Sequence, residues 1–133
     1  MKITVSAIEK KQNDIIVTCK FDTGTLKGIW KGKTFPVLNL AYHVEFTFDD
    51  IDINHVKKIH DNQETISVDL KNDDVYFTGI CETYDGEIHF IRFENGWLQM
   101  IYISENGQSI QPNDNILFWM KYSQIQIFPY NIY

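Results

Sequence analysis

The alternation of apolar and polar residues is clearest between Val75 and Ile103, where three extended runs are separated by two short turns. Asp85-Gly86 and Asn95-Gly96 form these turns. Both dipeptides are typical of type I′ hairpins, in which the two central residues have positive φ angles. The pattern therefore predicts a three-stranded antiparallel meander over this segment.

The remainder of the chain has a similar pattern. Ile, Val, Phe and Thr are frequent and Ala occurs only twice, which favours sheet over helix. Tyr42–Phe48 alternates cleanly between apolar and polar residues. Asn54 can cap one short helix near residues 54–61. The other predicted strands are Ile3–Glu9, Ile15–Phe21, Thr25–Lys31, Thr65–Leu70, Ile116–Tyr122 and Gln124–Pro129, with a polar loop at Glu105–Asn115.

The two halves of the chain are similar to each other. A shift of 72 residues aligns residues 3–53 with residues 75–125 without a gap, and eight positions are identical. Several turns and inward apolar positions coincide as well. We therefore predict an all-β, antiparallel protein with a 72-residue internal repeat, residues 1–72 and 73–133, arranged as two similar small barrels or half-barrels in one compact unit. The alternative is that two unrelated meanders share alternation and turn residues.

Each half has a long strand, two hairpin-linked strands, a loop, and one or two further strands. This order is carried by runs such as Gly79-Ile80, Ile91-Arg92-Phe93 and Ile125-Gln126-Ile127. It resembles the oligonucleotide/oligosaccharide-binding (OB) barrel, possibly in tandem. The resemblance concerns the fold alone, because such barrels host many functions and no functional motif accompanies the strand order here.

The net charge of −6 is unevenly distributed. Residues 1–72 contain ten Lys and ten Asp or Glu, whereas residues 73–133 contain one Arg and one Lys against eight Asp or Glu. An acidic half repels phosphate backbones and attracts basic proteins. The charge therefore makes a nucleic-acid partner improbable and favours a basic protein partner.

The halves differ at four positions that should point outward. Thr4, Thr18, Thr25 and Thr47 in the first half correspond to large aromatic residues in the second half. With Ile88 and Ile101 beside them and acidic residues around them, these aromatics have the composition of a protein interface. The alternatives are that this face packs on the first half or forms a homodimer. The predicted partner-binding residues are Tyr76, Phe90, Trp97, Trp119, Glu82, Glu87 and Glu94.

A second group of residues suggests a different ligand. Four lysines cluster around two neighbouring predicted strands with Trp30 among them, and charge combined with stacking can hold single-stranded nucleic acid or a small ligand. Alternation places Trp30 inward, however, which favours a solvated lysine face. The residues of this alternative site are Lys20, Lys27, Trp30, Lys31 and Lys33.

No catalytic or cofactor motif is recognisable. His43 and Glu45 have no third metal ligand at a suitable spacing, and no serine lies in a G-x-S-x-G motif. Cys19 and Cys81 are expected to be buried thiols of a reducing compartment. No segment approaches the roughly 20 apolar residues of a membrane span. We therefore expect a non-enzymatic, cytoplasmic protein-binding module without a metal, cofactor or membrane partner, for instance an immunity-type inhibitor of a basic toxin such as a nuclease.

Overall fold

The computed structural model describes residues 1–59, 66–94, 97–103 and 110–131. This part of the chain is all-β, as predicted, and its only helical segments are two 3-10 turns, η1 (Ile53–His55) and η3 (Tyr122–Gln124). The strands are β1 (Lys2–Lys11), β2 (Asp14–Phe21), β3 (Gly24–Trp30), β4 (Ala41–Phe48), β5 (Val56–Ile59), β6 (Ser67–Lys71), β7 (Asp74–Asp85), β8 (Ile88–Glu94), β9 (Trp97–Tyr102), β10 (Asn115–Lys121) and β11 (Ile125–Asn131).

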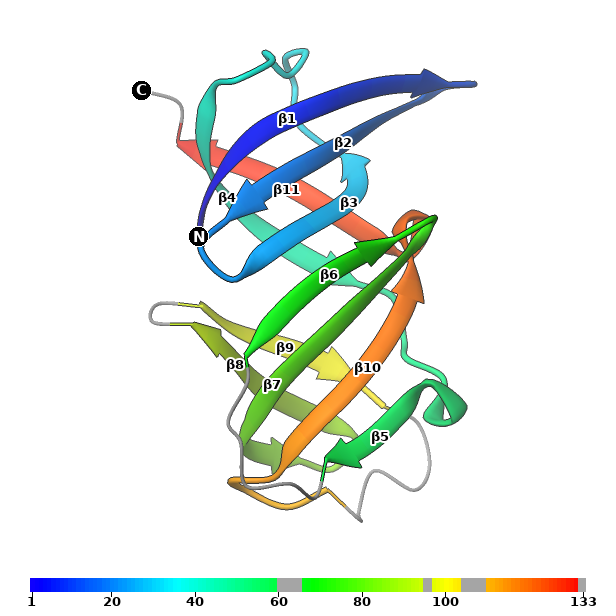
Figure 1. The fold of residues 1–133 in the computed structure, drawn as a ribbon, viewed down its shortest axis with the longest axis vertical. Coiled ribbons are helices and arrows are strands. Elements are labelled where there is room, and N and C mark those ends of the chain that lie inside the picture. The colour runs from blue at the N-terminus through cyan, green and yellow to red at the C-terminus, as the bar shows by residue number, and fades with distance from the viewer. Residues whose placement is uncertain (60–65, 95–96, 104–109, 132–133) are drawn as a thin grey trace.

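Five strands close into a barrel at one end of the molecule (Figure 1). Around it, β1 pairs with β2, β2 with β3, β3 with β11, β11 with β4, and β4 with β1. The β3–β11 pair is parallel and the other four are antiparallel. This closed five-stranded barrel is compatible with an OB-like barrel. Its fifth strand comes from the C-terminal end of the chain.

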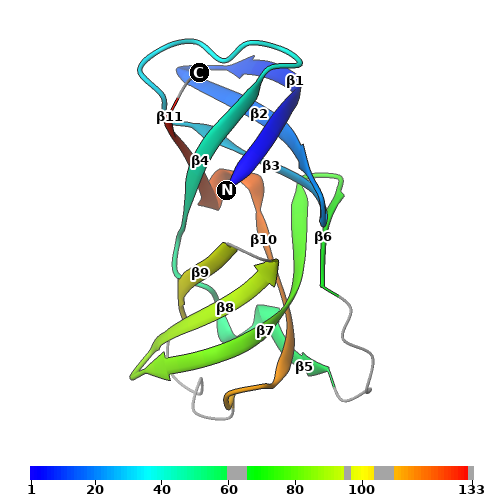
Figure 2. The same ribbon diagram turned by 90° about the vertical axis from the view of Figure 1, so that its left-hand side faces the viewer.

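The remaining strands are arranged around β7, which is long enough for its two ends to pair with different strands. Residues Asp74–Ile80 pair with β10, and residues Ile80–Asp85 pair with β8. On the outer sides, β6 pairs with β7, β5 with β10, and β9 with β8. Figure 2 shows the β7–β8–β9 meander below the barrel, with β4 running down toward it.

A parallel contact joins the two groups of strands. Gly24 on β3 pairs with Val68 on β6, and a Cβ atom at Gly24 would lie 1.8 Å from the Val68 carbonyl oxygen. Only glycine allows this approach of two backbones. Gly24 therefore connects the sheet of the barrel to the sheet built around β7.

The predicted meander is confirmed, because β7, β8 and β9 are consecutive antiparallel neighbours. Gly86 has φ 63° in the first turn, but neither Asp85 nor Glu87 has a positive φ. Because Asp85 pairs with Ile88, the two-residue turn is Gly86-Glu87, so the type I′ turn expected at Asp85-Gly86 is wrong. The second turn, Asn95-Gly96, and residues 104–109 of the predicted polar loop lie outside the described residues.

Two expectations require correction. The sheet is mixed instead of antiparallel throughout, because β3 pairs in parallel with both β6 and β11. The helix predicted near residues 54–61 is wrong: Asp52 caps the short η1 turn, and Val56–Ile59 then forms a strand on the edge of β10. Pairing with β10 satisfies the backbone of this segment and thus outweighs its weak helical signal.

Strand pairing also crosses the predicted boundary between residues 72 and 73. Strand β11 completes the barrel of β1–β4, and β5 pairs with β10. A second closed barrel is not confirmed, and the duplication stays a prediction.

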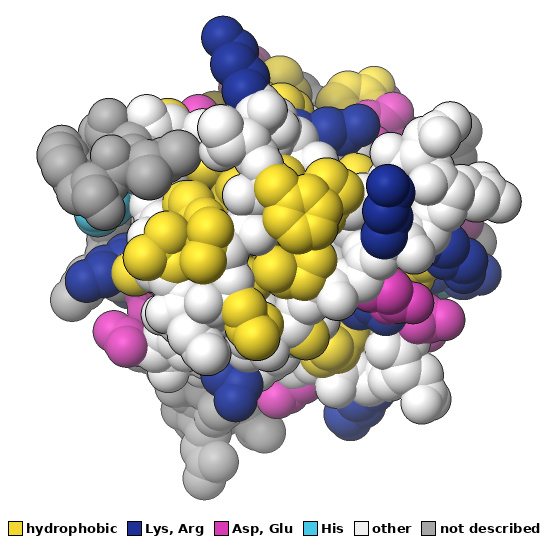
Figure 3. Space-filling model, turned by 90° about the horizontal axis from the view of Figure 1, so that it is seen from above, with side chains coloured by type: hydrophobic (Ala, Val, Ile, Leu, Met, Phe, Trp, Pro, Cys, Tyr) yellow, Lys and Arg dark blue, Asp and Glu magenta, His cyan; other side chains and the backbone are white. Residues whose placement is uncertain are grey.

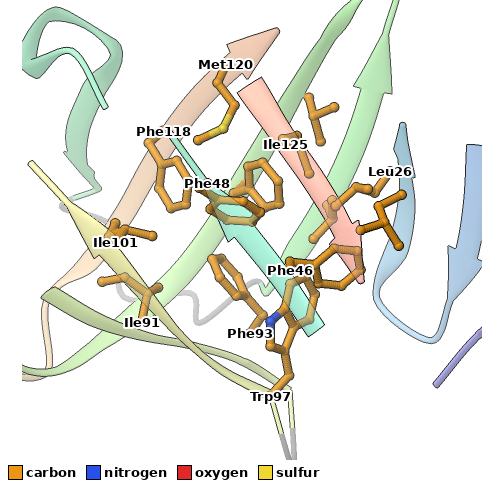
Figure 4. Packing of buried hydrophobic residues seen from close by; sticks show 14 of the residues in the cluster. Leu26, Phe46, Phe48, Ile91, Phe93, Trp97, Ile101, Phe118, Met120 and Ile125 are labelled. Carbon is orange, nitrogen blue, oxygen red and sulfur yellow. The ribbon is translucent and has the colours of Figure 1, made fainter. Parts of the chain in front are cut away.

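One continuous hydrophobic core fills the structure. Phe46 and Phe48 on β4 extend it from the barrel toward the second group of strands (Figure 4). Phe48 packs at 5.0 Å from Phe77, measured between ring centroids, and Phe77 stacks on Phe118 at 4.9 Å. β4 therefore contributes to the packing of both groups.

Candidate protein-binding face

The outer surface of the β8–β9 hairpin is unusually apolar. Leu98, Met100 and Tyr102 on β9 are 54%, 58% and 37% exposed. Ile88 and Phe90 on β8 are their partly buried neighbours, since Phe90 pairs with Met100 and Ile88 pairs with Tyr102. We call these five side chains the hairpin face. Large apolar side chains gathered in this way are typical of contact surfaces.

Strand β9 is also an edge strand. Within the described residues, its only ladder partner is β8. On its other side a groove of about 580 Å³ separates it from β4. Leu98, Met100 and Tyr102 line one wall of this groove, and Val44–Phe48 lines the other. The hairpin face therefore continues into a concave surface beside the edge of β9, which is a common arrangement for binding another chain. In the described part of the chain, only the C-terminal end of this edge is covered, where the Ile51 N–H donates to the Tyr102 carbonyl oxygen.

Acidic side chains surround the hairpin face. Glu82 forms an ion pair with Arg92, and Glu87 accepts a hydrogen bond from the Tyr102 hydroxyl group. The pKa of Glu94 is raised, first by burial and then by the nearby Asp22 carboxylate, while the N-terminal amine opposes the shift. These carboxylates create a negative rim that would attract a basic partner.

Trp97 does not belong to this face, so its predicted outward position is wrong. It is only 4% exposed and packs at 4.7 Å from Phe93 and 5.2 Å from Phe46. Its indole N–H donates to the side-chain oxygen of Gln99 at 3.1 Å. Ile101, also expected outward, is 1% exposed.

A β-bulge explains this reversal. In the first half, β2 and β3 pair in unbroken register, and Cys19 faces Leu26. In the second half the register shifts between Arg92 and Glu94, so that Ile91 faces Gln99 instead of Leu98. A shift of one residue exchanges the two faces of a strand. It turns Trp97 inward and leaves Leu98 and Met100 outside.

Tyr76 and Trp119 lie on another part of the surface. They are cross-strand partners on β7 and β10, and their rings stack at 5.9 Å. His55 also stacks on Trp119 at 5.2 Å, and the ammonium groups of Lys57 and Lys71 lie over the Trp119 and Tyr76 rings. The ring faces are therefore contacted by side chains of the same protein. Of the four predicted aromatics, only Phe90 lies on the hairpin face.

The alternative lysine site is not assembled around Trp30. Trp30 is 5% exposed, and its indole N–H donates to the Thr34 carbonyl oxygen at 2.8 Å. Lys27 lies between Glu9 and Asp73, 3.7 and 3.4 Å from their carboxylates, and covers the Tyr122 ring. Lys20, Lys31 and Lys33 are exposed. Trp30 is therefore not available for stacking with a base.

Both cysteine thiols are held in unreactive settings. Cys19 and Cys81 are buried free thiols, as predicted, and burial raises the pKa of both. Asp114 and Glu82 raise the pKa of Cys81 further. In the described ranges, no three His, Cys, Asp or Glu side chains are grouped to hold a metal ion. None of the helices among the described residues has the length and apolar character to span a bilayer.

The sequence interpretation missed Leu98, Met100 and Tyr102. Their alternation with Trp97, Gln99 and Ile101 was visible, but five of the six residues are apolar or aromatic. The polar Gln99 suggested that Trp97, Gln99 and Ile101 face outward, which is the opposite of what is observed.

In comparisons with known proteins, no family model, curated protein or solved structure matches this chain.

Proposed function

We propose that this protein is a non-enzymatic protein-binding module that docks a basic partner through the hairpin face. The observation that carries the proposal is the exposure of Leu98, Met100 and Tyr102 on an edge strand beside a groove. Apolar side chains at the centre and charged groups at the rim are the usual anatomy of an interface.

The acidic rim supports a basic partner over a second copy of the chain. In a symmetric pair of hairpin faces, Glu82, Glu87 and Glu94 of one copy would approach the same carboxylates of the other. Like charges brought together in this way oppose association, whereas Lys and Arg side chains of a partner would be attracted.

A specific instance is an immunity-type inhibitor, which would neutralise a basic toxin such as a nuclease by covering its active cleft. The acidity of the second half and the unreactive thiols support this instance. Buried cysteines that remain unpaired also support a cytoplasmic location.

The proposal is tested by affinity capture, in which the wild-type protein and the double variant Leu98→Ser/Met100→Ser serve as baits. Both substituted residues are exposed, so the fold should persist. Proteins that bind the wild type should not bind the variant, because apolar side chains at the centre of an interface commonly contribute more than about 1 kcal/mol each to the free energy of binding. The captured proteins should be basic and should elute as salt is raised.

Phe35→Ser/Leu38→Ser is the matched control, since it removes two similarly exposed apolar side chains elsewhere. It should retain the same proteins as the wild type. Equal capture by all three proteins would remove the hairpin face as the binding site. For the inhibitor instance, the nuclease activity of a captured protein should fall when the wild type is added and should be unaffected by the hairpin variant.

We further propose that the two halves are duplicated OB-like units that have exchanged their last strands. The order of four strands, a 3-10 turn and a strand occurs twice, as β1–β4, η1 and β5 and as β7–β10, η3 and β11. The pairs β1–β2, β2–β3 and β1–β4 correspond to β7–β8, β8–β9 and β7–β10. The strand after each 3-10 turn pairs with the fourth strand of the other half, since β5 pairs with β10 and β11 pairs with β4.

A further inference from the structure

A second apolar surface lies at the barrel end of the structure, away from the β8–β9 hairpin. The segment of residues 31–40, which we call the tip loop, connects β3 to β4 at the barrel end of the long axis (Figures 1 and 2). Phe35, Val37 and Leu38 are 57%, 53% and 52% exposed, and Leu40 is 36% exposed. Four large apolar side chains within six residues therefore face solvent.

The barrel holds the tip loop in this shape. The Trp30 indole donates to the Thr34 carbonyl oxygen at 2.8 Å, and the Val37 N–H donates to the Tyr42 hydroxyl oxygen at 2.9 Å. The Asn39 N–H donates to the Val5 carbonyl oxygen at 2.8 Å. Each hydrogen bond fixes the backbone next to an exposed apolar side chain. The backbone of the loop is therefore held by the barrel, and its exposed apolar side chains point away from the core.

The charge around the tip loop is positive. Lys31 and Lys33 are exposed within it, and residues 31–44 contain no Asp or Glu. Residues 1–48, which supply four barrel strands, contain seven Lys against four acids, and β11 contains no charged residue. Residues 49–124 contain five Lys or Arg against fourteen acids. The charge is therefore separated between the barrel and the rest of the chain.

We propose that the tip loop docks the protein on an anionic phospholipid surface. Phe35, Val37 and Leu38 enter the headgroup region, and Lys31 and Lys33 contact the phosphates. Apolar insertion combined with attraction to anionic lipids is the usual basis of peripheral membrane binding, and it requires no membrane span. The sequence expectation of no membrane partner rested on the absence of such a span.

The surroundings of the loop favour a lipid surface over a second copy. Figure 3 looks along the long axis onto this end, where hydrophobic side chains gather at the centre and both basic and acidic side chains lie around them. Two tip loops placed face to face would bring four lysines together, which opposes pairing. An anionic bilayer attracts the barrel and repels the acidic remainder, so it also fixes the orientation. The hairpin face then remains free for a protein partner.

The experiment is co-sedimentation of the full chain with vesicles of phosphatidylcholine alone and of a phosphatidylcholine–phosphatidylserine mixture. The wild type should sediment with the mixed vesicles, bind the neutral ones more weakly, and dissociate as salt is raised. Phe35→Ser/Leu38→Ser should lose binding to both. Lys31→Ser/Lys33→Ser should weaken binding to the mixed vesicles by about five-fold per lysine and leave binding to neutral vesicles unchanged.

Leu98→Ser/Met100→Ser is the control, because it removes two exposed apolar side chains from the hairpin face. It should bind vesicles as the wild type does, so a failure of the protein-binding proposal leaves this result intact. Circular dichroism of each variant checks the fold. Absence of wild-type binding to mixed vesicles at low salt would overturn the proposal, as would unchanged binding by Phe35→Ser/Leu38→Ser. If the wild type does not bind vesicles but forms a dimer that Phe35→Ser/Leu38→Ser does not form, the loop would be assigned to self-association instead.

Discussion

The side-chain amide of Gln99 on β9 donates to the backbone carbonyl oxygen of Phe46 on β4 at 3.0 Å. The same side chain accepts a hydrogen bond from the Trp97 indole. Gln99 is only 7% exposed, and it joins two strands that form no ladder with each other among the described residues. One polar side chain therefore satisfies two buried groups at the inner edge of the groove.

Replacement of Gln99 by Met should destabilise the protein. It keeps the side-chain length but leaves the Trp97 N–H and the Phe46 carbonyl without this partner. A buried polar group left unsatisfied costs about 1–3 kcal/mol. Urea unfolding should show a loss in this range. Met100→Gln, the reverse change at the exposed neighbouring position, should alter stability by less than about 0.5 kcal/mol. Equal stability of the two variants would contradict a structural role for the Gln99 amide.

Substitution of Gly24 should separate β3 from β6. A Cβ atom at this position would collide with the Val68 carbonyl oxygen, so Gly24→Ala should cost more than about 2 kcal/mol in the free energy of unfolding. Gly86→Ala is the control, since φ at Gly86 is also positive but nothing lies within 4 Å of the added atom. It should cost about 1–2 kcal/mol from backbone strain alone. Denaturant titration that ranks Gly86→Ala as the more harmful change would disprove the close approach.

Removal of residues 125–131 should abolish the native fold. This deletion takes away β11 and exposes the edges of both β3 and β4. The truncated chain should lose cooperative thermal unfolding and near-ultraviolet circular dichroism. A synthetic peptide of residues 122–131, added in trans, should restore both signals, whereas a scrambled peptide should not. A cooperatively folded truncation would show that the barrel does not depend on β11.

Glu94 should make stability depend on pH. Its pKa is raised above the ordinary value of 4.5 by burial and by Asp22, so the folded state binds its proton more tightly than the unfolded state does. This contribution favours folding at low pH and is lost as the pH rises from 4.5 through the raised pKa. Glu94→Gln should therefore be more stable than the wild type at neutral pH, with a smaller difference below pH 4.5.

The measurement is urea unfolding of both proteins between acidic and neutral pH. Asp22→Asn is a second variant to compare, because removal of the neighbouring carboxylate should lower the pKa of Glu94. The pH range over which Glu94 changes the stability should then become narrower. A constant difference between wild type and Glu94→Gln at every pH would contradict the raised pKa.

Local features of the sequence were sufficient for the meander. A glycine between two strand-like runs was enough to predict a turn there, although the two-residue turn is Gly86-Glu87 and begins one residue later than expected. The burial of Cys19 and Cys81 followed in the same way from their place inside apolar runs. The partners of β3 were beyond such reasoning, since its contact with β11 joins residues almost a hundred positions apart. Local periodicity contains no information about which distant strand will lie beside it.

The candidate site shows the same limit. Phe90 lies at the hairpin face as expected, because the pairing of β8 with β9 is regular from Ile88 to Arg92. On β9, which side chains face inward depends on a bulge in β8, where one extra residue lies opposite β9. Apolar residues also occupy both faces of β9, so the sequence pattern did not reveal which face is buried. The exposure of Phe35 and Leu38 depends on hydrogen bonds between the tip loop and three strand residues, namely the donor Trp30 and the acceptors Tyr42 and Val5.

The position of β11 has a consequence for biosynthesis. Strands β1 to β4 are translated before β11, the strand that closes their barrel, and β5 to β10 lie between them in the sequence. Until residue 131 has emerged from the exit tunnel, β3 and β4 each lack a neighbour, and unpaired strand edges invite association with other nascent chains. Completion of this barrel is therefore expected only after β11 has been translated, and mutations in β11 should reduce the yield of soluble protein in cells more than mutations of the exposed residues of β9.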